Sequence, residues 1–130
     1  MSTDDLLIRL VEDARVDLQR RRALISQDQL ERAIAAHTPE DFVGALRRPG
    51  LSVIAEMKQR TPSMGVLSED YRPMELAHAY TEGGAAAISV LTHMAGFGGR
   101  PEHIQEARLA THLPNRPGMI ARLARQRRLP

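Results

Sequence analysis

Residues 51–65 place the strongest constraint on the fold, because an apolar stretch there ends in charged residues and opens into a loop. Residues 51–58 predict a buried strand: the run is short, apolar and β-branched near its start, and a Pro-Gly pair precedes it. Glu56 and Lys58 are two residues apart, so on a strand they project from one face, with Ile54 below them. Burying a carboxylate and an ammonium group is costly unless they pair or meet a ligand. The pattern therefore indicates either the rim of a binding site or an exposed ion pair at a strand end.

Lys58 is also unusual for its residue type. It is the only lysine among the 18 basic residues of the chain, and all the others are arginines. An arginine does not release its proton near neutral pH, whereas the surroundings of a lysine can tune its pKa. This contrast favours a functional role for Lys58, although a GC-rich genome would produce the same preference for arginine at the other positions.

The chain after this stretch alternates between predicted helices and strands. Pro73 opens a helix that a Gly-Gly pair ends, residues 86–92 form a second strand that is apolar on both faces, and Pro101 opens another helix. An apolar run of this kind is typical of a parallel sheet covered by helices. The order predicts a βα barrel or an open α/β sheet. In a barrel the site lies at the carboxyl ends of the strands, where the loops 59–68 and 93–100 fall.

Three helices are predicted before the first strand. The first covers residues 4–22, where apolar residues recur at helical spacing, and Ser2, Thr3 or Asp4 can cap it. A capping box of Ser26 with Gln29 predicts the start of the second. Thr38-Pro39 predicts the start of the third, and Pro49-Gly50 its end.

Composition narrows the class of protein. A length of 130 residues accommodates one ordinary domain, and the absence of cysteine excludes disulfides and thiolate metal sites. We find no apolar run of the roughly 20 residues that cross a bilayer, and the acidic N-terminus lacks a signal-peptide pattern. A cytoplasmic protein that does not engage membranes is expected.

The positive charge is concentrated near the C-terminus. Five arginines lie within the last fifteen residues, at positions 116, 122, 125, 127 and 128, and no acidic residue follows Glu106. The Arg-rich segment 116–128 could be interpreted as a binding segment for nucleic acid or for an acidic protein. It lacks aromatic residues or a known motif, so we do not expect nucleic acid as a partner.

Several linked motifs, in matching order and spacing, closely resemble the indole-3-glycerol-phosphate synthase family. The resemblance runs from about residue 4 to residue 114 and includes the helices before the barrel. Its motifs are Val53-Ile54-Ala55-Glu56-Met57-Lys58, Thr61-Pro62-Ser63-Met64-Gly65-Val66, Glu82-Gly83-Gly84-Ala85-Ala86-Ala87-Ile88-Ser89-Val90-Leu91-Thr92 and Phe97-Gly98-Gly99.

This resemblance implies a (βα)₈ TIM barrel and a decarboxylating lyase of tryptophan biosynthesis. The substrate would be a carboxyphenylamino-deoxyribulose phosphate, closed to indole-3-glycerol phosphate. Lys58 would hold its anionic groups and favour the ring-closing geometry, with Glu56 orienting Lys58. Thr61 and Ser63 would border the substrate carboxylate, and Phe97 would pack against its aromatic ring. The resemblance implies no metal and no organic cofactor.

The sequence also departs from the family pattern. A barrel of this kind needs about 250 residues. The resemblance places a lysine general acid on the third strand, a general-base glutamate on a later strand and phosphate-binding glycine loops after them, but the chain holds no second lysine. Residue 72, where the family usually has a capping aspartate, is an arginine.

We therefore expect an incomplete barrel of α/β class, truncated before the third strand. Residues 1–48 are predicted to form the helical extension, residues 49–114 the first two βα units, and residues 115–130 a basic tail unrelated to the family. The chain is expected to be inactive alone. The alternative is a non-catalytic truncated paralogue or fragment that needs a complementing chain, and unpaired strand edges predict self-association.

Overall fold

The computed structural model describes residues 2–37, 40–111 and 115–117. The chain divides into two units, residues 1–39 and residues 40–130. Most of the predicted basic tail lies outside the described residues. None of the helices in the described ranges is long and apolar enough to cross a membrane.

The first unit consists of two helices, α1 (Thr3–Leu24) and α2 (Gln27–Ala35). Each begins with a capping box, in which a serine side chain and the side chain three residues later satisfy one another's backbone N–H groups. The pairs are Ser2 with Asp5 and Ser26 with Gln29, at 2.9–3.2 Å. Both predicted helices are confirmed, and the box at Ser26 is the one expected from the sequence.

The second unit starts with a short helix, α3 (Phe42–Leu46), which begins later than predicted. The side chain of Asp41 caps it by accepting a hydrogen bond from the Gly44 backbone N–H at 2.8 Å. Thr38 and Pro39, the predicted start, lie outside the described residues. Phe42 is the one buried residue of α3, and the helix contacts the sheet at β4.

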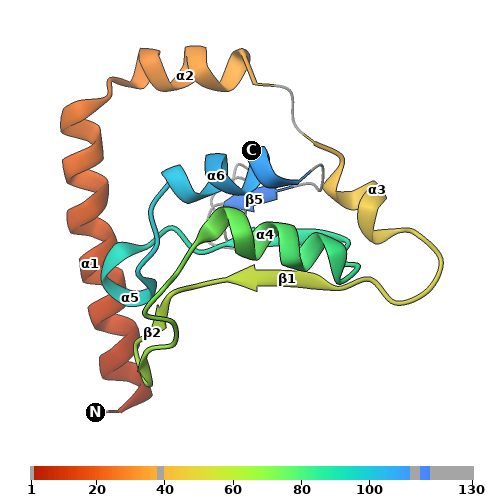
Figure 1. The fold of residues 1–130 in the computed structure, drawn as a ribbon. Helices are drawn as coiled ribbons and strands as arrows, with labels where there is room; N and C mark the ends of the chain where they lie inside the picture. Colours follow the sequence, from red (N-terminus) through yellow and green to blue (C-terminus); the bar gives the residue numbers. More distant parts are fainter. Residues whose placement is uncertain (1, 38–39, 112–114, 118–130) are drawn as a thin grey trace. The chain divides into compact units, whose positions relative to one another are not determined.

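A parallel three-stranded sheet forms the centre of the second unit (Figure 1). Its order is β1 (Ile54–Met57), β4 (Ala87–Val90), β5 (Asn115–Pro117), and both strand pairs are parallel. Helix α4 (Pro73–Glu82) connects β1 to β4, and α6 (Glu102–Ala110) lies between β4 and β5. Parallel strands with intervening helices are consistent with part of a TIM barrel.

Two sequence predictions about this sheet need correction. The first strand is shorter than residues 51–58, and it is not buried as a whole, since Leu51 is 96% and Ile54 46% exposed. In the described sheet β1 pairs only with β4, so one of its edges has no neighbour to cover it. The described sheet also has a third strand, β5, beyond the two predicted βα units. Its residues Asn-Arg-Pro carry no apolar pattern that would have revealed it.

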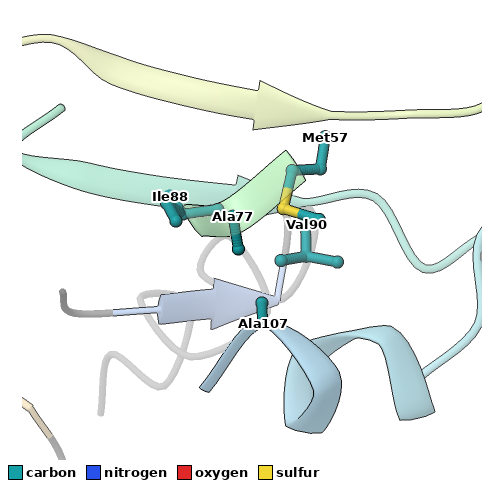
Figure 2. Packing of buried hydrophobic residues seen from close by; sticks show 5 residues of the cluster. All are labelled: Met57, Ala77, Ile88, Val90 and Ala107. Carbon is teal, nitrogen blue, oxygen red and sulfur yellow. The ribbon is translucent and has the colours of Figure 1, made fainter. Parts of the chain in front are cut away.

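The core lies where α4 and α6 pack against the sheet. Figure 2 shows Met57, Ile88 and Val90 from the strands meeting Ala77 of α4 and Ala107 of α6. All five side chains are fully buried. Small alanines on both helices allow their backbones to approach the larger strand side chains closely. Because side chains alternate on a strand, Ile54 and Glu56 project from the sheet face opposite to Met57.

Candidate functional site

Glu56 and Lys58 are brought together at the carboxyl end of β1. The Lys58 Nζ donates a hydrogen bond to the Glu56 Oε1 at 2.8 Å, which is also an ion pair. The two side chains are 41% and 34% exposed, for Glu56 and Lys58 respectively. The pair is thus neither buried nor free in solvent. An ammonium group has three donors, so Lys58 keeps donors available for an anionic ligand while Glu56 holds its position.

The backbone of Glu56 has a partner that the sequence did not indicate. Tyr80 of α4 donates from its hydroxyl group to the Glu56 carbonyl oxygen at 3.2 Å. The side chain is partly buried against the core cluster. A tyrosine on a helix face is usually a core residue, and only the packing of α4 on β1 reveals that its hydroxyl reaches the end of the strand.

Thr61 and Ser63 lie in a small hairpin that follows β1. Strands β2 (Arg60–Thr61) and β3 (Gly65–Val66) pair antiparallel across a turn. The Thr61 Oγ1 accepts a hydrogen bond from the Met64 backbone N–H at 3.0 Å, which stabilises the turn. Ser63 is exposed within that turn and takes no part in the Glu56–Lys58 ion pair. The sequence predicted a loop here and missed the hairpin.

Phe97 lies at the end of a short helix, α5 (Met94–Phe97), rather than in an irregular loop. His93 caps α5: its Nδ1 accepts from the Gly96 backbone N–H at 3.3 Å. The rings of His93 and Phe97 meet edge to face, with centroids 6.3 Å apart. His93 therefore packs against the aromatic residue that the family resemblance places at the substrate ring, a contact that the sequence did not indicate.

The hairpin and α5 lie side by side at the carboxyl ends of β1 and β4. The Leu91 backbone N–H donates to the Met57 carbonyl at 3.1 Å, just after the two strands end. Beyond it, the Gln59 backbone N–H donates to the Phe97 carbonyl at 3.1 Å. Helix α5 also contacts β2. The structure thus brings the segment of Phe97 next to the residue that follows Lys58.

The chemistry available at this edge is that of a cationic and acidic pair, with the segment that carries an aromatic residue bonded to the residue that follows Lys58. Such a set can bind an anionic aromatic ligand and orient a lysine as a proton donor. Within the described residues, no group of three or more histidine, aspartate or glutamate side chains is arranged to hold a metal ion.

Comparison with known proteins identifies the family. The model of the indole-3-glycerol phosphate synthase family matches residues 7–117, three residues beyond the boundary predicted from the sequence and through the last residue of β5. Among curated relatives, indole-3-glycerol phosphate synthase 2 of Streptomyces coelicolor is 57% identical over 110 residues, covering 84% of this chain and 43% of the relative.

Two further relatives give the same result. The indole-3-glycerol phosphate synthase of Mycolicibacterium smegmatis is 44% identical over 115 residues, covering 88% of this chain and 42% of the relative. That of a Roseiflexus species is 44% identical over 108 residues, covering 81% and 40%. The chain spans about two-fifths of the length of these curated relatives. With a family match across most of its residues, the chain belongs to the indole-3-glycerol phosphate synthase family.

Proposed function

We propose that this chain supplies the first-strand part of an indole-3-glycerol phosphate synthase active site. The observation that carries the proposal is the Glu56–Lys58 ion pair at the carboxyl end of β1, inside the region that matches the family. Lys58 binds the anionic groups of the carboxyphenylamino-deoxyribulose phosphate and favours ring closure. Glu56 orients Lys58 and balances its charge.

The three remaining residues line the same site in this proposal. Thr61 and Ser63 border the substrate carboxylate from the β2–β3 hairpin, and Phe97 packs on the substrate ring from α5. The hydrogen bond between the Gln59 N–H and the Phe97 carbonyl supports this arrangement, because it joins the two segments that carry these residues.

Residues 1–130 do not catalyse the reaction by themselves in this proposal. The resemblance places a general-acid lysine on the third strand, whereas β5 has the sequence Asn115-Arg116-Pro117 and Lys58 is the only lysine. Losing one positioned acid or base typically lowers a rate about 10²–10⁴-fold. Catalysis therefore requires further strands, from a longer polypeptide or from a complementing chain that pairs along β1.

A pair of assays tests the proposal. Residues 1–130, purified alone, should form no indole-3-glycerol phosphate above background when its fluorescence is followed. A hybrid of residues 1–113 with the remaining strands of the Streptomyces coelicolor relative should be active. Turnover by residues 1–130 that Lys58→Ala abolishes would contradict the inactivity.

Lys58 is tested in the same hybrid. Lys58→Arg should lower kcat/KM, because a planar guanidinium does not replace a compact ammonium group. Arg48→Ala removes one positive charge from an exposed position between α3 and β1, and it should leave kcat and KM unchanged. Equal kinetics for the hybrid and its Lys58→Arg variant would show that Lys58 is only a surface charge.

A further inference from the structure

Gln59 joins three backbone segments at the carboxyl edge of the sheet. Its N–H donates to the Phe97 carbonyl at 3.1 Å, and its carbonyl accepts from the backbone N–H groups of Leu67 at 2.8 Å and Ser68 at 3.3 Å. The first bond reaches α5, and the other two close the end of the β2–β3 hairpin. One residue thus ties the hairpin to itself and to the segment after β4.

Gly98 makes this junction possible. It ends α5 in the left-handed conformation, with φ of 68°, and its N–H donates to the Met94 carbonyl at 2.9 Å. A Cβ atom at Gly98 would lie 2.5 Å from the Gln59 Oε1 and 2.9 Å from the Gln59 Cβ. The Gln59 side chain therefore occupies the space that any other residue at position 98 would need. We call Gln59 and Gly98 the loop clamp.

The loop clamp sits between two proposed substrate contacts. Lys58 immediately precedes Gln59, and Phe97 immediately precedes Gly98. Each contact residue is one peptide bond from the clamp, so a shift of the clamp moves the cation and the aromatic ring relative to each other. A misplacement of about 1 Å in an active site can lower a rate about 10²-fold.

We propose that Gln59 and Gly98 act as a positioning pair that fixes the distance between Lys58 and Phe97. Neither residue touches substrate in this proposal; both act through their neighbours. The positioning role rests on the proposed function, whereas the existence of the clamp does not.

Gly98→Ala tests the clamp, with Gly84→Ala as its matched control. Gly84 also has a positive φ, 88°, but a Cβ there meets no atom within 4 Å. Both variants carry the conformational cost of a left-handed alanine, and only Gly98→Ala adds the clash with Gln59. Amide exchange in the 130-residue chain is the first measurement. Exchange at Gln59, Leu67 and Ser68 should become about tenfold faster in Gly98→Ala than in Gly84→Ala.

The second measurement uses the hybrid barrel. Gly98→Ala should raise KM and lower kcat, for a total loss of about 10- to 100-fold in kcat/KM, because Lys58 and Phe97 are misplaced for both bound substrate and transition state. A variant that merely loses folded enzyme lowers apparent kcat with KM unchanged. Gln59→Gly combined with Gly98→Ala removes the clash and should recover part of the loss.

The outcomes separate the clamp from the proposed function. Equal exchange in Gly98→Ala and Gly84→Ala would overturn the clamp itself. Faster exchange with unchanged hybrid kinetics would overturn the positioning role. A hybrid that is inactive without any substitution would contradict the proposed function and the positioning role together, while the exchange result would still show whether the clamp exists.

Discussion

Strands β1 and β4 have similarly apolar sequences but very different environments. All four residues of β4 are buried, whereas only Met57 is buried in β1. Ala87 pairs with Ile54 in the register and projects from the same face, yet Ala87 is fully buried and Ile54 is 46% exposed. The difference lies in the neighbours, because β4 has a strand on each side and β1 has one on a single side of the described sheet. Burial follows position in the sheet more than residue type.

The largest expected effect is on the free energy of unfolding, when one isoleucine of each strand is replaced by alanine and the two variants are compared. Ile88→Ala opens a cavity among Met57, Ala77 and Ala107, and should lower the free energy of unfolding by about 2–5 kcal/mol. Ile54→Ala removes a side chain that is already half in water, so its cost should stay below about 1.5 kcal/mol. Urea denaturation of the two variants measures both values. Equal losses would mean that β1 is covered in solution.

The edge of β1 that has no partner strand in the described sheet should also promote self-association. An unpaired strand edge offers backbone N–H and C=O groups to another chain, and a lysine on such a strand opposes this pairing. Ile54→Lys should weaken association about tenfold, which corresponds to about 1.4 kcal/mol. Leu109→Lys is the control, because it places the same charge on an exposed apolar residue of α6, away from the edge. Light scattering over a concentration series measures the strength of self-association of both variants. Equal effects of the two substitutions would exclude β1 as the association edge.

A further difference concerns pH, because helix α6, which packs over the core, carries a buried histidine. His103 of α6 is 4% exposed, and its ring meets Tyr71 edge to face at 5.4 Å. Burial, and then the charge of Arg100, hold the pKa of His103 below its usual value, against the opposing effect of Glu106 and Glu102. Burial also raises the pKa of Tyr71 to about 12, so the phenol stays neutral near neutral pH.

Acid should therefore destabilise this region. The unfolded chain binds a proton at His103 more readily than the folded chain does, so stability is present above pH 6.5 and falls as the pH drops below that value. The Arg100 N–H and Nε lie 3.3 Å from the two ring nitrogens, and a neutral ring can accept at only one of them. A protonated ring accepts from neither. His103→Gln should flatten the pH dependence of the urea midpoint, and His78→Gln, at an exposed position, should not.

The sequence predicted β4 well because its apolar run sits where every neighbour is present. Residues 86–92 were expected and Ala87–Val90 were found, all buried. For β1 the same reasoning predicted too much burial, because an apolar pattern does not reveal which strands lie beside it. Strand β5 was missed for the opposite reason, since Asn-Arg-Pro has no strand pattern although it pairs with β4.

The candidate site also has one part that the sequence predicted and one part that it did not. The spacing of Glu56 and Lys58 was sufficient to predict that their side chains meet, because two residues on one strand have a fixed relation. The contact of His93 with Phe97 is local, at a spacing of four residues. The bond from Gln59 to Phe97 instead depends on how two segments, 38 residues apart in the chain, approach one another. No local pattern encodes that approach. Gly98 belongs to a sequence motif, but only the structure shows that this glycine accommodates the Gln59 side chain.

The smallest expected effect on stability concerns the Glu56–Lys58 pair itself, and it sharpens the contrast between the strands. A partly exposed ion pair contributes about 0.2–1 kcal/mol, so Glu56→Gln should lower the free energy of unfolding by less than about 1 kcal/mol. In the active hybrid the same substitution should lower kcat/KM much more, because Lys58 loses the carboxylate that orients it. Ile88→Ala should show the reverse, with a large loss of stability and near-normal kcat in the folded fraction. A loss of stability above about 2 kcal/mol in Glu56→Gln would place the pair with the buried structural elements instead. The half-exposed face of β1 contributes little to the core, and the Glu56–Lys58 pair at its carboxyl end is correspondingly accessible to solvent.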